Sequence, residues 1–212
     1  MFRFVMLMML WVPPAASAAP SILVYGDSLS AAYGIANDQG WAVLLQKKLT
    51  ALGYPHRVAN ASISGETTSG GRSRIAATLK QQQPAIVILA LGANDGLRGL
   101  PVKDMQANLA AIIAACRAQR ARVLLVGMRI PPNYGPRYTE AFAAAYPELS
   151  RQFKLPLVPF LLDGVGGDRA LTQEDGLHPT AAAQPRLLEN LWSELQPLLG
   201  MPVKTKSRQA AS

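Results

Sequence analysis

The sequence predicts an α/β fold, a three-layer α/β/α sandwich around a flavodoxin-like, five-stranded parallel sheet. Two observations support this prediction. Short apolar runs recur along the chain between polar and glycine positions, which is typical of strands buried on both faces of a parallel sheet. Longer segments between them place apolar residues three and four positions apart, which is the spacing of amphipathic helices. Strands that alternate with helices in this way imply a parallel sheet covered on both faces.

The expected elements alternate along the whole chain. Strands are predicted near residues 22–25, 57–61, 85–91, 122–128 and 157–160. Helices are predicted from Asn37 to about residue 52 and near residues 71–83, 104–119, 138–153 and 180–199. Asn37 is a residue type that caps helix N-termini, and Gly53 is one that ends helices. The polar segments that follow the first three strands should meet at one edge of the sheet.

The first residues have the order of a secretory signal peptide. Arg3 precedes an apolar core at residues 4–12, and small residues at 16–18 supply a cleavage site. The apolar run is too short to span a bilayer, which argues against a membrane anchor. We therefore expect residues 1–18 to be removed and the protein to be exported, to the periplasm in a Gram-negative type of cell.

One domain and a basic tail make up the rest. Residues 19–200 are predicted to form the domain, and residues 201–212 a disordered basic tail with Lys204, Lys206 and Arg208. The formal net charge of +8 suggests anionic partners, among them weak contact with a membrane surface. No basic and aromatic stripe occurs, so nucleic-acid binding is not expected. A monomer is the default expectation.

Ser28 stands in the turn that follows the first strand, within Gly26-Asp27-Ser28-Leu29-Ser30. In an open α/β sheet the active-site crevice lies beyond the carboxyl ends of the strands. The Ser28 hydroxyl is therefore at a position expected for a catalytic group. Asp27 and Ser28 could equally belong to an ordinary turn, because both residue types form local hydrogen bonds to the backbone. Residues further along the chain decide between the two interpretations.

His178 is the better candidate for the base that a serine nucleophile requires. The chain has two histidines, and His56, with no acid nearby in sequence, is expected to have a surface or packing role. His178 follows Asp175 by three residues, close enough for one turn to bring carboxylate and imidazole together. The same residues also suit a helix-entry turn, although the upstream serine favours the chemical interpretation.

Acyl transfer also needs donors directed at a developing oxyanion. The candidates are the backbone N–H groups of Ser28 and Gly65 and the side-chain amide of Asn94. Glycine permits close approach to a ligand, and asparagine supplies a neutral donor. An ordinary loop glycine and turn asparagine remain the alternatives for each of them alone.

Several other site types do not fit. The nucleophile elbow of α/β-hydrolases requires Gly-x-Ser-x-Gly, and Ser30 occupies its second glycine position. With two histidines and one cysteine, no metal-binding pattern is present, and nucleotide-binding motifs are missing too, so no cofactor is expected. Cys116, in an alanine-rich helical stretch, is expected to be a small buried filler.

Four separated blocks together resemble the GDSL, or SGNH, hydrolase family. They are Gly26-Asp27-Ser28-Leu29-Ser30, Gly65 within residues 60–67, Gly92-Ala93-Asn94-Asp95, and Asp175-Gly176-Leu177-His178-Pro179. Residues 94–99 and 129–135 make the chain similar to the periplasmic subgroup of multifunctional acyl-CoA thioesterases, arylesterases and lysophospholipases. The resemblance implies catalytic Ser28, Asp175 and His178, with an oxyanion hole formed by Ser28, Gly65 and Asn94.

The resemblance further implies that residues 95–101 and 130–138 wall an acyl pocket. Leu97, Leu100, Ile130 and Tyr134 suit an alkyl chain, although they could instead pack these loops onto the sheet. The expected activity is hydrolysis of small carboxylic esters, and of thioesters or lysophospholipids, through an acyl-serine intermediate. The alternatives are a carbohydrate O-acetyl esterase and a non-catalytic acyl-chain carrier.

Overall fold

The computed structural model describes residues 19–202 and contains one parallel sheet of five strands. The strands are β1 (Ser21–Gly26), β2 (Arg57–Asn60), β3 (Ile86–Ala90), β4 (Arg122–Val126) and β5 (Leu157–Val158). Their spatial order is β2-β1-β3-β4-β5, and every neighbouring pair is parallel. The predicted α/β class, strand number and flavodoxin-like order are therefore confirmed.

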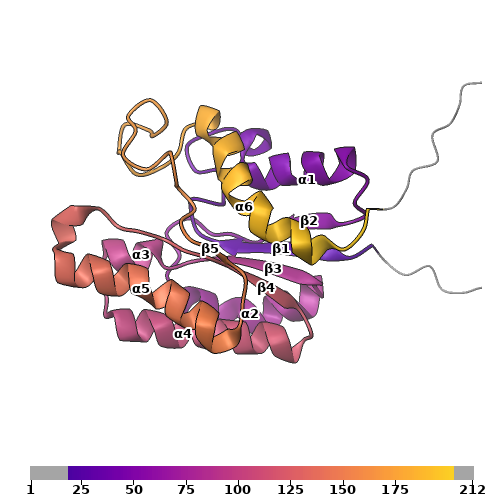
Figure 1. Cartoon of the computed structure of the whole chain (residues 1–212), viewed down its shortest axis with the longest axis horizontal. Coiled ribbons are helices and arrows are strands. Elements are labelled where there is room, and N and C mark those ends of the chain that lie inside the picture. The colour runs from indigo at the N-terminus through magenta and orange to yellow at the C-terminus, as the bar shows by residue number, and fades with distance from the viewer. Residues whose placement is uncertain (1–18, 203–212) are drawn as a thin grey trace, which may run out of the picture.

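Helices cover both faces of the sheet (Figure 1). Helices α1 (Trp41–Ala51) and α6 (Gln184–Leu199) pack together on one face. Helices α2 (Thr68–Gln82), α4 (Val102–Ala118) and α5 (Pro136–Phe153) form the layer on the other face. The strands end at one edge, here called the carboxyl edge. They begin at the opposite edge, here called the amino edge, where these five helices end.

The core lies between these layers. Residues 22–25 of β1 and 86–90 of β3 have no exposed surface, as expected for strands covered on both faces. Tyr25 belongs to this core, and its hydroxyl donates a hydrogen bond to the carbonyl oxygen of Gly71 at 2.7 Å. Cys116 is fully buried, and burial raises the pKa of its thiol to about 12. It is therefore an inert filler, as predicted.

The start of the first helix differs from the prediction. Asn37 lies in a short 3-10 helix (Asn37–Gln39) and does not cap α1, which begins at Trp41 after Gly40. The N–H of Trp41 instead donates to Oε1 of Gln184, 3.0 Å away. Because this partner comes from α6, 143 positions away in sequence, local capping rules did not identify it.

Two other helix starts also differ. Helix α2 begins at Thr68, three residues earlier than predicted, because the Thr67 side chain caps it by accepting from the Gly70 N–H. The final helix begins at Gln184, after a separate 3-10 helix (Ala181–Ala183). A short helix, α3 (Ala93–Leu97), replaces the loop that was expected after β3.

The predicted signal peptide, residues 1–18, and residues 203–212 of the predicted tail lie outside the described residues. Within residues 19–202, no helix is long and apolar enough to cross a membrane. Met201 and Pro202, the described part of the tail, are exposed and belong to no helix or strand.

Candidate active site

Ser28 lies in the turn directly after β1, at the carboxyl edge. Oδ1 of Asp27 accepts a hydrogen bond from the Leu29 N–H at 3.0 Å, and the Trp41 indole donates to the Leu29 carbonyl at 3.0 Å. Gly26 allows this tight turn, because a Cβ there would lie 2.7 Å from Oγ of Ser30 and 2.9 Å from the Ala90 carbonyl oxygen. The serine is thereby fixed over the end of the sheet.

His178 and Asp175 form one compact turn in the segment between β5 and α6. One carboxylate oxygen of Asp175 accepts from the N–H groups of Leu177 and His178, at 2.9 and 3.0 Å. The other oxygen lies 2.6 Å from Nδ1 of the His178 ring. Partial burial alone would raise the pKa of Asp175, but these hydrogen bonds outweigh it and lower the pKa to about 2. The carboxylate is therefore ionised at neutral pH.

The structure brings these three side chains together although Ser28 and His178 are 150 positions apart in sequence. Nε2 of His178 lies 2.9 Å from Oγ of Ser28, while Nδ1 faces Asp175. Since Asp175 accepts a hydrogen bond from the Nδ1–H group, Nε2 is left with a lone pair directed at the serine hydroxyl. The hydroxyl can donate its proton to that nitrogen.

The three predicted oxyanion donors also lie at the carboxyl edge. Within residues 19–202, the N–H groups of Ser28 and Gly65 donate to no protein acceptor. Nδ2 of Asn94 donates to the Glu66 carbonyl at 3.1 Å, which fixes the amide beside the Gly65 loop. Gly65 has a positive φ of 78°, a backbone conformation that favours glycine.

Polar contacts to helix α2 hold the segments that carry these donors. Both carboxylate oxygens of Asp95, next to Asn94, accept from Thr68, one from its hydroxyl at 2.6 Å and one from its N–H at 2.8 Å. Nε of Arg74 donates to both carboxylate oxygens of Glu66 at 2.8 and 2.9 Å. Because these contacts join α3 and the Gly65 loop to α2, the donors can meet a ligand without rearrangement.

A small cavity of about 80 Å³ opens at the Ser28 hydroxyl. The same walls continue into an apolar groove of about 340 Å³. Five residues line both spaces: Arg129, Ile130, Pro131, Leu162 and Leu177. The combined space can accommodate an alkyl group extending from an ester carbonyl held at Ser28.

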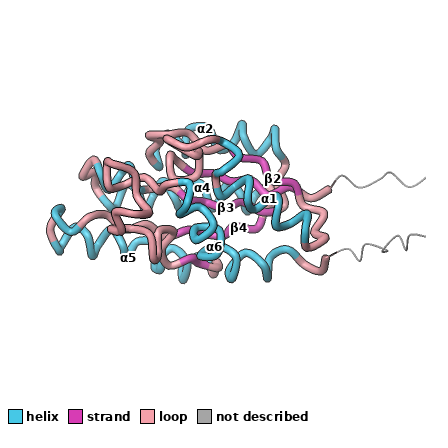
Figure 2. Tube along the Cα trace, turned by 90° about the horizontal axis from the view of Figure 1, so that it is seen from above, coloured by secondary structure: helices cyan, strands magenta, loops and turns pink. Residues whose placement is uncertain are grey.

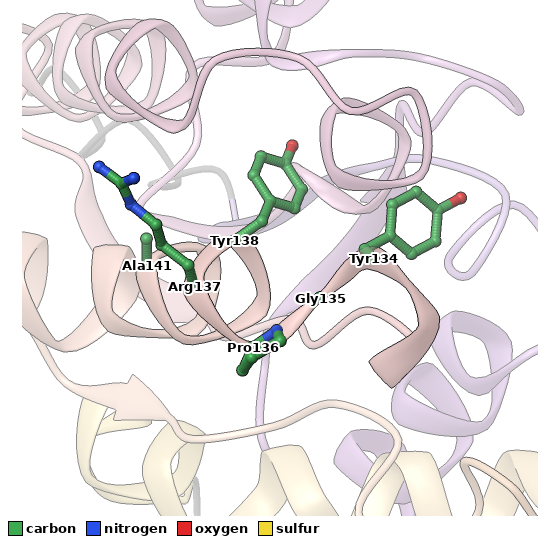
Figure 3. A pocket seen from close by; sticks show the side chains of 6 residues that line it. All are labelled: Tyr134, Gly135, Pro136, Arg137, Tyr138 and Ala141. Atoms are coloured by element: carbon green, nitrogen blue, oxygen red, sulfur yellow. The ribbon is translucent and has the colours of Figure 1, made fainter.

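Only part of the predicted pocket wall is confirmed. Leu97 and Ile130 line the cavity at Ser28, but Leu100 and Tyr134 do not. Tyr134 lines a separate cavity with residues 135–138 and Ala141 (Figure 3). Its hydroxyl donates to the carbonyl oxygen of Leu97 at 2.8 Å. Tyr134 therefore holds a residue of the cavity wall in place without lining the cavity itself.

The sequence analysis did not assign Leu162 or Leu177 to the pocket wall. Leu162 and Leu177 line the cavity from the long segment after β5. Leu177 belongs to the fourth motif block, which was a usable signal, whereas no pattern distinguished Leu162. His56, the other histidine, is 4% exposed directly before β2 at the amino edge, which fits the expected packing role.

The sequence profile of the GDSL-like lipase/acylhydrolase family matches residues 24–185. The chain belongs to this family. It is 54% identical over 183 residues to Esterase TesA of Pseudomonas aeruginosa, covering 86% of this chain and 91% of the relative. It is 42% identical over 184 residues to Thioesterase 1/protease 1/lysophospholipase L1 of Escherichia coli, covering 87% of each.

A solved structure supports the same assignment. The psychrotrophic esterase EstA from Pseudoalteromonas sp., inhibited by monoethylphosphonate, superposes with a TM-score of 0.81 at 42% identity. The match covers 85% of this chain and 99% of the esterase. The family and the named activities of these relatives make this member of the GDSL family a hydrolase of acyl esters.

Proposed function

We propose that the protein hydrolyses carboxylic esters, thioesters and lysophospholipids through an acyl-serine intermediate formed on Ser28. The observation that supports this most directly is the pair of contacts from Ser28 to His178 at 2.9 Å and from His178 to Asp175 at 2.6 Å. Inhibition of the related EstA by a phosphonate agrees with it, since such compounds trap activated serines. A serine held by an imidazole whose other nitrogen faces a carboxylate is activated as a nucleophile.

The chemistry proceeds in two halves. Oγ of Ser28 attacks the carbonyl carbon while Nε2 of His178 takes its proton, and Asp175 stabilises the imidazolium. The N–H groups of Ser28 and Gly65 and the amide of Asn94 donate to the oxyanion. The imidazolium then protonates the leaving alcohol or thiol as the carbon–oxygen or carbon–sulfur bond breaks. Water, activated by His178, releases the acid and restores Ser28.

The shape of the site favours acyl chains over a lone acetyl group. The groove beside Ser28 has mostly apolar walls, among them Leu162 and Leu177. Each buried methylene contributes about 0.8 kcal/mol, so an extending chain should increase binding until it fills the groove. The apolar groove therefore favours a lipid-type ester over a sugar acetate as the substrate.

Labelling with a fluorophosphonate, followed by peptide mapping, tests the mechanism. We expect one label per chain, on Ser28, together with hydrolysis of p-nitrophenyl esters that favours chains longer than acetyl. Ser28→Ala should lose the label and nearly all turnover. Ser30→Ala is the matched control, since that hydroxyl is buried without a partner among the described residues. Substantial turnover by Ser28→Ala would overturn the mechanism, whereas binding of fatty acid without turnover or label would favour a carrier.

Export and assembly form a separate part of the proposal. Residues 1–18 direct export to the periplasm and are removed there, and the mature chain works as a monomer. All six roles proposed at the site are filled from one chain, which supports the monomer. Mass spectrometry of the protein from a periplasmic extract, with size-exclusion chromatography, tests both. A retained N-terminus or a stable dimer would contradict them.

A further inference from the structure

The amino edge of the sheet concentrates positive charge without acids. The connections from each helix to the next strand, residues 52–56, 83–85, 119–121 and 154–156, contain no Asp or Glu. The cations at this edge are Lys48, Arg57, Lys80, Arg117, Arg120, Arg122, Arg151 and Lys154. The acids gather instead near the carboxyl edge, and Glu148 and Glu194 lie more than one turn before the ends of α5 and α6.

Helix dipoles account for only half of these cations. Lys48, Lys80, Arg117 and Arg151 occupy or border the last turns of α1, α2, α4 and α5, where positive charge offsets the partial negative charge of the helix end. The remaining four lie in the connections or at the strand starts. Among these, Arg120 and Lys154 have positive φ angles of 60° and 49°, a conformation that glycine adopts more easily.

Four of the cations surround a shallow cavity of about 390 Å³. Arg117, Arg120, Arg122 and Lys154 line it, and its apolar part includes Val123, Leu155 and Leu198. Within residues 19–202, none of these four forms an ion pair with a carboxylate. Their mutual repulsion disfavours this arrangement unless an anionic partner is near.

Both ends of the described chain meet this edge (Figure 2). Met201 is 89% exposed after the end of α6, and Leu52 is 48% exposed after the end of α1. The sequence that follows Pro202 adds Lys204, Lys206 and Arg208 without an acid. Exposed apolar side chains beside many cations are typical of surfaces that meet anionic lipid.

We propose that the amino edge is a docking surface for an anionic phospholipid membrane. The charges extend across the whole edge, from Arg57 at the start of β2 to Lys154 before β5, so a broad charged surface meets more of them than a small anion does. Leu52 and Met201 can enter the interfacial region while the cations contact phosphate groups. Docked in this way, the protein holds the carboxyl edge, with Ser28, away from the lipid and open to water.

Vesicle sedimentation tests the docking surface. The purified protein is mixed with vesicles of phosphatidylcholine, with or without phosphatidylglycerol. We expect binding only to the anionic vesicles and release by added salt, because exposed charges are screened. The triple variant Arg120→Gln, Arg122→Gln, Lys154→Gln should bind on the order of a hundredfold more weakly, given the contribution of each basic residue at such a surface. These side chains form no hydrogen bond or ion pair within residues 19–202, so the fold should persist.

A control variant tests whether binding depends on the cations of the amino edge or only on the net charge of the protein. Lys103→Gln, Arg137→Gln and Arg169→Gln remove the same charge from exposed residues that lie away from the amino edge. This control should keep its vesicle binding. Equal losses in the two triple variants, or no binding to anionic vesicles, would overturn the proposal. Competition by inorganic phosphate at an ionic strength matched with sodium chloride would assign the edge to a free anion instead.

The orientation has its own readout. Protein that sediments with vesicles should hydrolyse a water-soluble p-nitrophenyl ester as fast as free protein, and loss of turnover on docking would contradict the orientation. Vesicle binding is measured without turnover, so failure of the proposed ester chemistry and failure of the docking surface are distinguishable.

Discussion

The phenol ring of Tyr33 lies against the imidazole ring of His178, with centroids 4.5 Å apart and planes inclined by 39°. The Gln173 side-chain amide reinforces this contact by donating to the carbonyl oxygens of Tyr33 and Pro179, at 2.8 and 3.0 Å. The turn that holds Ser28 and the turn that holds His178 are therefore joined. Because the two rings are in contact, Tyr33 covers part of the imidazole, while the rest of its own side chain, 51% exposed, faces solvent.

Tyr33 should support the imidazolium that forms during turnover. An aromatic face near a cation contributes about 0.5–2 kcal/mol, so Tyr33→Leu should lower kcat by about 2- to 30-fold with little change in KM. Tyr33→Phe keeps the ring and should retain most of the rate. Steady-state kinetics on a soluble ester measures both. Equal losses in the two variants would show that the hydroxyl, or the fold of the turn, is what matters.

Removal of the Asn94 amide should slow turnover without loss of the fold. Asn94→Ala removes a proposed oxyanion donor and should lower kcat on the order of a hundredfold or more. Asn133→Ala, at an exposed position in the 3-10 helix Pro132–Tyr134, is the matched control and should retain its rate. A full rate in Asn94→Ala would remove this side chain from the oxyanion hole.

Asp175 should affect turnover strongly and acid stability weakly. Asp175→Asn presents the wrong hydrogen-bonding partner to Nδ1 of His178 and should lower kcat on the order of 10⁴-fold.

The pKa of Asp175 falls from 3.8 to about 2 on folding, so its contribution to stability is present above pH 3.8 and is lost toward pH 2. Its side chain is 39% exposed, and solvent therefore screens part of that contribution. Thermal melts at pH 5 and pH 3 should show a slightly smaller acid-induced loss in the variant.

Asp27 should have the opposite effect on the pH dependence of stability. Its Oδ2 is buried without a hydrogen-bond partner among residues 19–202, and burial raises its pKa from 3.8 to about 7. The folded state thus favours the neutral acid, and its contribution to stability is lost as pH rises from about 4 through 7. Asp27→Asn removes the ionisation, so its melting temperature should fall less than that of the parent between pH 5 and pH 8. The exposed Asp38→Asn variant controls for one lost charge, and parallel curves for Asp27→Asn and the parent would contradict the expectation.

The sequence was sufficient to predict the α/β class and the strand order, and to propose which residues form the site. Apolar runs such as 22–25 indicate buried strands, because every position of a strand covered on both faces must be apolar. Ser28, Gly65 and Asn94 could be proposed because parallel strands place the segments after them at one edge. Asp175 and His178 could be paired because three residues fit within one turn.

Only the tertiary structure decided contacts between residues distant in sequence. Gln184 completes the start of α1, Tyr33 covers His178, and Leu162 lines the cavity, while Leu100 and Tyr134 lie outside it. A hydrophobic pattern predicts that a side chain is buried, but it does not predict which residues surround that side chain. The surrounding residues depend on how the loops pack onto the sheet. The cations of the amino edge likewise form one surface only after parallel strands bring four separate connections side by side.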